Sequence, residues 1–316
     1  MSSLRLKFIS LQEKINQSVL GQENTVQQLV IALLADGHVL LQGLPGLAKT
    51  RSVNAMATQL ACNLNRIQFT PDMLPADVTG CEVYDSQSQT LSFKRGPVFT
   101  HLLLADEINR APAKVQSALL EAMAEGQVSV AGESHPLPDL FMVLATQNPV
   151  EQEGTYPLPE AQMDRFLIQI LVDYPDKEAE KQMLRMLRSE RSINSNASSE
   201  LTTDEVLTAR QLVDQVHVSE QVDQYIIDIV HATRYPSTEL ATVIELGASP
   251  RASIALDKCA RAHAWLNGQD YVAPENVRAI AHSVLRHRLA LSFSALNQGV
   301  TAEAVITQLL ENVGFA

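Results

Sequence analysis

Short apolar runs alternate with helical patterns through the first half of the chain. The runs occupy residues 38–42, 67–70, 102–105, 141–145 and 166–172. Residues 4–33 show a helical period that is interrupted at 21–24, and a further helix is predicted over 52–63. Near-continuous apolar strands separated by helices are typical of a parallel sheet that is buried on both faces. The pattern therefore predicts an α/β core in which helices flank a parallel sheet.

Two segments interrupt this alternation. Residues 81–84 and 91–94 flank the polar turn DSQSQT, and residues 127–130 precede Ala-Gly-Glu at 131–133. Both segments are predicted as β-hairpins, near 81–94 and 127–137. Ordinary surface loops remain an alternative, because the local pattern alone does not separate the two.

After residue 174 the chain changes character. Asp176 is a plausible N-cap for a helix over 177–188, and a Ser/Asn-rich polar loop covers 189–203. Further helical patterns lie near 203–217, 219–234, 250–266, 274–286 and 301–312. We therefore predict two domains, an α/β domain over 1–174 and a smaller all-α domain over 175–316.

Composition narrows the class of protein. The 316 residues are 46% hydrophobic and 19% charged, which fits an ordinary globular protein. No window of 18 apolar residues predicts a membrane span, and no signal peptide is apparent, so a cytoplasmic location is expected. The net charge of −12 argues against a nucleic-acid partner, which needs clustered basic residues. The three cysteines lack metal-binding spacing.

Residues 43–50, GLPGLAKT, follow the first predicted strand and precede a helix. In that setting successive backbone N–H groups can wrap a phosphate at a helix N-terminus. Lys49 would reach the β- and γ-phosphates, and the Thr50 hydroxyl would bind Mg²⁺. Ala48 stands where a phosphate-binding loop usually has glycine, but a helical backbone accepts its methyl group. A strand–turn–helix with a chance lysine is the alternative.

Carboxylates end the third predicted strand. Asp106 can hold Mg²⁺ through water, and Glu107 can polarise an attacking water, a pairing that suits hydrolysis. The alternative is that one of them only caps the next helix. The fourth strand leads into Asn148, whose neutral side chain could orient that water, although Asn148-Pro149 is also a common turn.

Two arginines complete the set. Arg165 comes just before the fifth strand, and Arg251 follows a predicted N-cap, Ser249, with Pro250 as the first helical residue. The helix dipole disfavours a cation at this position, and an opposing phosphate would explain Arg251 there. An ordinary surface ion pair is the alternative for each arginine.

Four segments together carry a family resemblance. GLPGLAKT, LLLADEINRA, ATQNPVEQEGTYPLPEAQMDRF and ASPRAS occur in this order. The chain closely resembles the MoxR family of AAA+ ATPases, in the clade with an insert in the second helix, from about residue 8 to about residue 312. The alanine before the loop lysine is a feature of that family. The resemblance implies an AAA+ P-loop core followed by an all-α lid domain.

The resemblance also implies roles for single residues. Asp106 and Glu107 would be the Walker B pair, Asn148 the first sensor and Arg251 the second, while Arg165 would be an arginine finger that enters the neighbouring subunit. The implied Mg²⁺ ligands are Thr50 and Asp106. The candidate nucleotide-binding residues are Gln22, which matches a position near the adenine, and Gly43, Leu44, Pro45, Gly46, Leu47, Ala48, Lys49, Thr50 and Arg51.

A ring-forming ATP hydrolase that uses Mg²⁺ is thus expected. The family implies a homo-oligomer, a hexamer, that remodels or activates client proteins with a von Willebrand factor A domain partner. A nucleic-acid motor is an alternative, but the two predicted hairpins are not basic. A nucleotide-gated assembly module with slow hydrolysis is another. Arg251 is expected to touch the γ-phosphate and draw the lid onto the sheet domain, with a hinge at 174–176.

Overall fold

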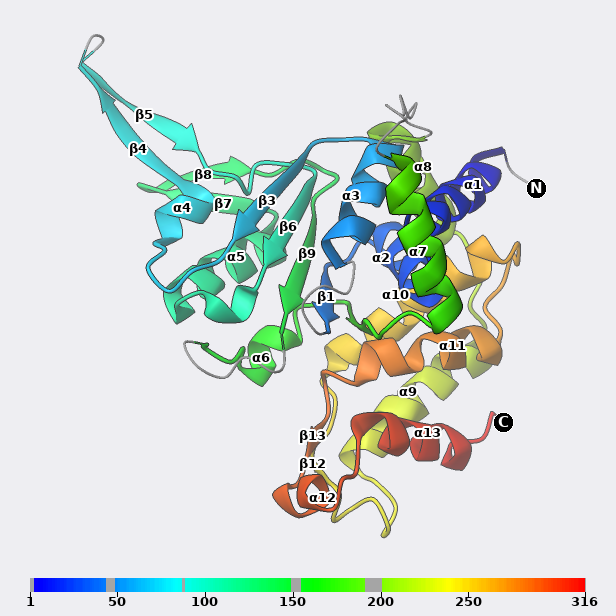
Figure 1. The fold of residues 1–316 in the computed structure, drawn as a ribbon. Helices are drawn as coiled ribbons and strands as arrows, with labels where there is room; N and C mark the ends of the chain where they lie inside the picture. The colour runs from blue at the N-terminus through cyan, green and yellow to red at the C-terminus, as the bar shows by residue number, and fades with distance from the viewer. Residues whose placement is uncertain (1–2, 44–48, 87–88, 149–154, 191–200, 316) are drawn as a thin grey trace.

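A computed structural model describes residues 3–43, 49–86, 89–148, 155–190 and 201–315. Within these residues five parallel strands form the central sheet, in the order β10 (Ile168–Leu171), β1 (Val39–Gln42), β9 (Met142–Gln147), β6 (Leu102–Asp106) and β3 (Leu64–Gln68). The predicted parallel sheet flanked by helices is confirmed (Figure 1).

The two faces of the sheet belong to two separate apolar cores. Val39 and Leu41 of β1 enter one core with α1 (Ser3–Ser18), α2 (Glu23–Leu34) and α3 (Lys49–Gln59). Leu40 enters the other core, which α4 (Pro75–Thr79) and α5 (Ala113–Glu125) cover. Successive side chains of a strand point to opposite faces. Burial on both faces therefore explains why the central strands appear as continuous apolar runs.

The second predicted strand is displaced along the chain. We predicted it over 67–70, whereas β3 covers Leu64–Gln68. β3 is the edge strand, so its polar residues Asn65 and Arg66 can face solvent and the apolar run is broken. A criterion based on apolar runs consequently begins this strand too late.

Both predicted hairpins form antiparallel pairs. The first consists of β4 (Gly80–Asp85) and β5 (Thr90–Arg95), and the second of β7 (Gln127–Val130) and β8 (Glu133–Pro136). The β4–β5 hairpin projects away from the sheet (Figure 1). The ring of Phe93 stacks on that of His135 with centroids 4.1 Å apart, which joins the two hairpins near their bases.

The second half of the chain is mainly helical. Its helices are α7 (Lys177–Glu190), α8 (Thr203–Asp214), α9 (Glu220–Arg234), α10 (Pro250–Leu266), α11 (Pro274–Leu285), α12 (Phe293–Asn297) and α13 (Ala302–Asn312). Short two-stranded pairs join β11 (Leu201–Thr202) to β2 (Leu60–Ala61) and β12 (Ile244–Leu246) to β13 (Ala290–Leu291). Most of the predicted polar loop lies outside the described residues, and the domain boundary near 174–176 stays a prediction.

Capping explains two of these helix starts. Asp176 Oδ1 accepts from the backbone N of Ala179 at 2.7 Å, and Ser249 Oγ accepts from the backbone N of Arg251 at 3.1 Å. Both predicted N-caps are therefore present. In the part of the chain that the structure describes, no helix combines the length and apolarity that a membrane crossing would require.

His38, just before β1, is a buried titratable group that we expect to make the fold sensitive to acid. Its Nδ1 accepts from the backbone N of Val143 at 3.0 Å, and its Nε2 donates to the carbonyl of Met123 at 3.1 Å. Burial lowers the pKa of His38 to about 4, with the Met123 hydrogen bond acting in the opposite direction. The neutral ring is thus the folded form, and its contribution to stability is complete above a pH of about 6.5.

We expect this contribution to be lost as the pH falls from about 6.5 towards 4. The unfolded chain binds the proton first, so lowering the pH from 7.5 to 5 should cost about 2 kcal/mol through His38. Urea unfolding of the wild type and of His38→Gln at both pH values measures this loss. The variant should lose less stability on acidification, and equal losses would contradict the assignment.

Candidate functional site

The residues expected to bind phosphate lie where β1 and β9 end. Lys49 Nζ donates to the carbonyl of Gly43 at 2.6 Å and to that of Gln147 at 3.5 Å. Lys49 also begins α3, and Thr50 follows it in the first turn. The structure therefore brings Gly43, Lys49 and Thr50 to the carboxyl edge of the sheet. Leu44, Pro45, Gly46, Leu47 and Ala48 lie outside the described residues.

Gly43 has no room for a side chain. A Cβ atom added there would lie 2.5 Å from the carbonyl oxygen of Val172 and 3.1 Å from its Cβ. The first loop glycine is thus required by the close approach of the chain that leaves β10. The same contact holds the start of the phosphate loop against Val172, the residue that follows β10.

Asp106 ends β6 at the same edge. Its Oδ2 pairs with Arg66 NH2 at 2.6 Å and with Nε of the same guanidinium at 3.2 Å. Its Oδ1 accepts from the hydroxyl of Thr146 at 2.6 Å. Residues on neighbouring strands therefore fix the carboxylate from two sides, and the group has the oxygen donors that Mg²⁺ prefers.

Glu107 follows in a left-handed backbone conformation, with φ of 57°. A residue other than glycine in this region carries strain of about 1–3 kcal/mol, which is found most often at functional sites. Its carboxylate accepts from Gln68 Nε2 at 2.8 Å and from Arg110 NH1 at 3.2 Å. These two donors hold the side chain next to Asp106.

Thr146 was not singled out by the sequence, yet it joins both carboxylate residues. Its hydroxyl donates to Asp106 and accepts from the backbone N of Glu107 at 2.9 Å. Arg66, Gln68 and Arg110 were also missed. The alternation of side chains along a strand could have indicated Arg66 and Gln68, because they share one face of β3.

We expect Thr146→Val to impair hydrolysis. The replacement keeps the shape of the side chain but leaves Asp106 and the backbone of Glu107 without their shared partner. Displacement of catalytic groups by about 1 Å can cost two orders of magnitude in rate, so kcat should fall about 10- to 100-fold. Steady-state ATPase assays measure the fall, with Thr146→Ser as the control. If both variants hydrolyse ATP at the wild-type rate, the hydroxyl has no such role.

Three further candidates lie on elements beside this edge. Asn148 is buried directly after β9 and accepts at its carbonyl from Asn109. Gln22 is also buried, and its side chain bonds to Thr25 and to the carbonyl of Asp173, so it links α2 to the chain after β10. Arg51 Nε donates to the carbonyl of Ser18 at the end of α1. Their roles towards a nucleotide stay predictions.

Arg165 and Arg251 lie at the opposite edge of the sheet. Both line a pocket of about 280 Å³ together with Gly37, His38 and Leu167, which precede β1 and β10. The length of β1, roughly 13 Å, thus separates this pocket from Gly43. Arg165 NH1 donates to the carbonyl of Leu120 near the end of α5, at 2.8 Å.

Arg251 lies away from Gly43 within one chain. We expected Arg251 to touch the γ-phosphate and draw the lid onto the sheet domain, and this role stays a prediction. In the structure its NH1 lies 3.7 Å from Oδ2 of Asp164, the residue that directly precedes Arg165. The reason is the packing of α10, which buries its apolar face in the core that α2 and α8 also enter. The start of α10 is thereby held at the amino edge of the sheet.

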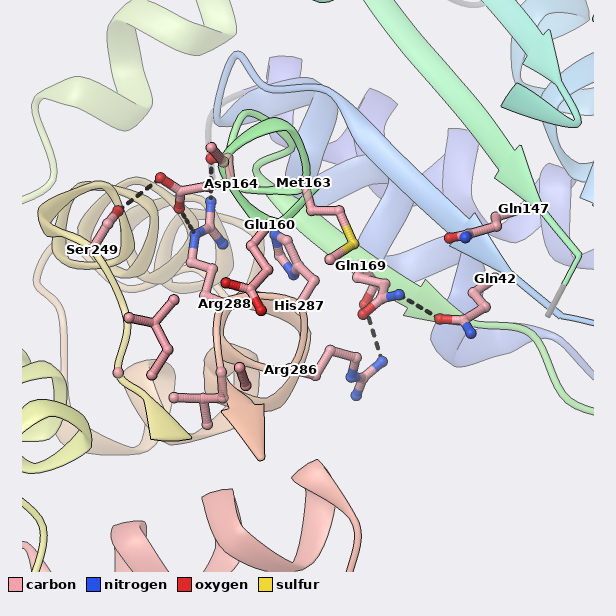
Figure 2. Close-up of a pocket in the computed structure, with 15 residues that line it drawn as sticks. Gln42, Gln147, Glu160, Met163, Asp164, Gln169, Ser249, Arg286, His287 and Arg288 are labelled. Atoms are coloured by element: carbon pink, nitrogen blue, oxygen red, sulfur yellow. Dashed lines mark hydrogen bonds and ion pairs between the residues drawn. The ribbon is translucent and has the colours of Figure 1, made fainter. Parts of the chain in front are cut away.

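A second pocket, of about 580 Å³, separates the sheet from the helical region (Figure 2). Side-chain amides of Gln42, Gln147 and Gln169 lie on its sheet side, and residues 286–290 lie on the other. Arg286 NH1 donates to the carbonyl of Gln169 at 3.0 Å. Burial, followed by the charge of Arg288, lowers the pKa of His287 well below its usual value. The neutral His287 ring donates to the carbonyl of Phe166 at 3.1 Å.

Comparison with known proteins identifies the class to which this chain belongs. Residues 38–168 match the ATPase family associated with various cellular activities (AAA), and residues 237–309 match the AAA lid domain. The two matches lie on either side of the predicted domain boundary. A central parallel sheet followed by a helical lid, with these two family matches, defines an AAA+ ATPase, and the chain is an ATP hydrolase.

Similar full-length proteins identify the family. Chaperone MoxR1 of Mycobacterium tuberculosis is 41% identical over 95% of this chain and 80% of its own length. Protein YeaC of Bacillus subtilis is 42% identical over 95% of this chain and 92% of its own. The crystal structure of a Cytophaga hutchinsonii protein shares 43% identity and a TM-score of 0.92, covering 99% of this chain and 96% of that one. The chain belongs to the MoxR family of AAA+ ATPases.

Proposed function

We propose that this protein is a ring-forming chaperone that hydrolyses Mg-ATP to remodel or activate other proteins. The observation that carries the proposal is the separation of the site residues. Lys49, Asp106 and Glu107 lie at the carboxyl edge of the sheet, whereas Arg165 and Arg251 lie at its amino edge. One chain therefore cannot bring all five to a single nucleotide, and two neighbouring chains in a ring can.

The residues at the carboxyl edge would bind and activate ATP. Lys49 offers a point charge to the phosphates, and its partners include the carbonyls of Gly43 and Gln147, which a phosphate can replace. The Thr50 hydroxyl and the Asp106 carboxylate would hold Mg²⁺, which would neutralise negative charge on the phosphates. Glu107 would accept the proton of the attacking water, and Asn148 would orient that water.

The residues at the amino edge would serve the nucleotide of the next subunit. Arg165 would be the arginine finger, and Arg251 would approach the same phosphate from the start of α10. Cations placed against the transferring phosphate are worth about three to five orders of magnitude in rate. We thus assign both arginines to the interface between subunits. A hexamer is the stoichiometry that the family resemblance implies.

Mixed rings test this division of roles. Arg165→Ala should retain ATP binding and lose hydrolysis, and Glu107→Gln should do the same for a different reason. When the two variants are mixed, each Glu107→Gln subunit can offer an intact Arg165 to a neighbour whose Glu107 is intact. ATPase activity should therefore rise above that of either variant alone.

Subunit exchange is established first, by labelling the two variants with a donor and an acceptor fluorophore and measuring energy transfer. With exchange shown, wild-type activity of Arg165→Ala alone or no recovery in the mixture would argue against a shared site. A double variant that carries both changes, mixed with either single variant, controls for dilution.

A protein client fits the exposed side chains better than a nucleic acid does. The β4–β5 hairpin exposes Val83, Tyr84 and Leu91, and the acidic Glu82 and Asp85 accompany Lys94 and Arg95 on its strands. Apolar, charge-balanced surfaces suit polypeptides rather than a phosphate backbone. A partner with a von Willebrand factor A domain and a cytoplasmic location are proposed from the family resemblance.

A further inference from the structure

Asp164 joins three elements at the amino edge of the sheet. It directly follows α6 (Glu160–Met163), and its side chain is 16% exposed. Oδ2 accepts from the hydroxyl of Ser249 at 2.8 Å, and Oδ1 pairs with Arg288 Nε at 2.9 Å. Figure 2 shows the three side chains together, with Asp164 between Ser249 and Arg288.

The hydrogen bond from Ser249 links Asp164 to the helix that carries Arg251. Ser249 is the N-cap of α10, and the same hydroxyl accepts from the backbone N of Arg251. One oxygen atom therefore joins the start of the helix that carries Arg251 to the residue that precedes Arg165. The Arg251 guanidinium itself lies 3.7 Å from Asp164 Oδ2.

Arg288 anchors this arrangement to the core. Its side chain is only 2% exposed, and it donates to the carbonyls of Phe166 at 2.6 Å and Leu167 at 3.0 Å. Because these residues continue from Arg165 into β10, the backbone after Arg165 is fixed to the segment that follows α11. Asp164 also separates two cations, Arg251 and Arg288, that would otherwise repel each other.

We propose that Asp164 is a positioning residue that holds Arg165 and Arg251 as one unit, through its hydrogen bond to the N-cap Ser249. The inference rests on the proposed action of both arginines on the next subunit's nucleotide. A displacement of α10 would move Arg251 and pull on Asp164, the residue joined to Arg165, so the two arginines engage or leave that nucleotide together.

Ser249→Asp separates this role from helix capping. Aspartate is as good an N-cap as serine, but an ionised carboxylate cannot donate to Asp164 and repels it. Ser249→Thr keeps both the cap and the donor. Ser219→Asp, at the N-cap of α9, makes the same exchange where Asp164 is not involved.

We expect Ser249→Asp to lower kcat for ATP about 10- to 100-fold with KM nearly unchanged, because misplaced arginines weaken the transition state and not ATP binding. Ser249→Thr and Ser219→Asp should keep wild-type kcat. Circular dichroism melts confirm that each variant is folded. Wild-type kcat in folded Ser249→Asp would overturn the proposal.

Mixing separates this proposal from the function on which it rests. Ser249→Asp subunits retain their own Lys49 and Glu107, so Glu107→Gln subunits should restore their activity. If Glu107→Gln subunits restore activity to Arg165→Ala but not to Ser249→Asp, the positioning role alone is overturned. If they do not restore activity to Arg165→Ala, the shared site itself is contradicted.

Discussion

Replacing Glu107 with glutamine is expected to leave ATP binding intact and to slow hydrolysis about 10³-fold. The amide keeps the size of the side chain and can still bond to Gln68 and Arg110, but it cannot take a proton from water. Loss of a general base typically costs two to four orders of magnitude in kcat. Single-turnover hydrolysis and equilibrium titration with a fluorescent ATP analogue measure the two quantities separately.

Lys49→Ala is the matched variant at the same edge, and there binding itself should be lost. The two variants thus divide the site into a residue that holds the phosphates and a residue that acts on water. Hydrolysis by Glu107→Gln at the wild-type rate would show that another group activates the water. The trapped ATP form of Glu107→Gln also provides bait for client proteins.

The central strands could be predicted because burial on both faces leaves a continuous apolar run. The same reasoning located Asp106, Glu107 and Asn148, since the carboxyl ends of parallel strands meet at one edge. β3 was placed too late because an edge strand tolerates polar side chains such as Arg66. The local sequence pattern is thus enough to predict the sheet and the part of the site at its carboxyl edge.

The other half of the site depends on contacts between distant residues. The sequence predicted the N-cap Ser249 and the helix start at Arg251, but nothing local says at which edge of the sheet that helix docks. Asp164 and Arg288 are 124 residues apart in the chain, and only the packing of α10 and α11 brings them together. The ion pair therefore could not be inferred from spacing.

Arg288→Met is expected to lower the free energy of unfolding by about 4 kcal/mol, the cost of breaking a buried ion pair by removing one partner. The guanidinium is nearly inaccessible, and burial lowers its pKa while Asp164 opposes that shift. Its loss leaves the carbonyls of Phe166 and Leu167 without these donors in a buried region. For a chain of this size the melting temperature should fall by about 6 °C.

Two further variants define what is lost. Arg261→Met breaks an ion pair with Asp257 in which the two side chains are 28% and 29% exposed. This variant should lower the free energy of unfolding by about 1 kcal/mol or less. Arg288→Lys keeps the charge but cannot donate in several directions at once, so it should recover only part of the stability. If Arg288→Met melts no lower than Arg261→Met, the Asp164–Arg288 pair does not hold the sheet to the helical region. The chain after Arg165 would then be held to the segment after α11 by the hydrogen bonds that His287 and Arg286 donate to the carbonyls of Phe166 and Gln169.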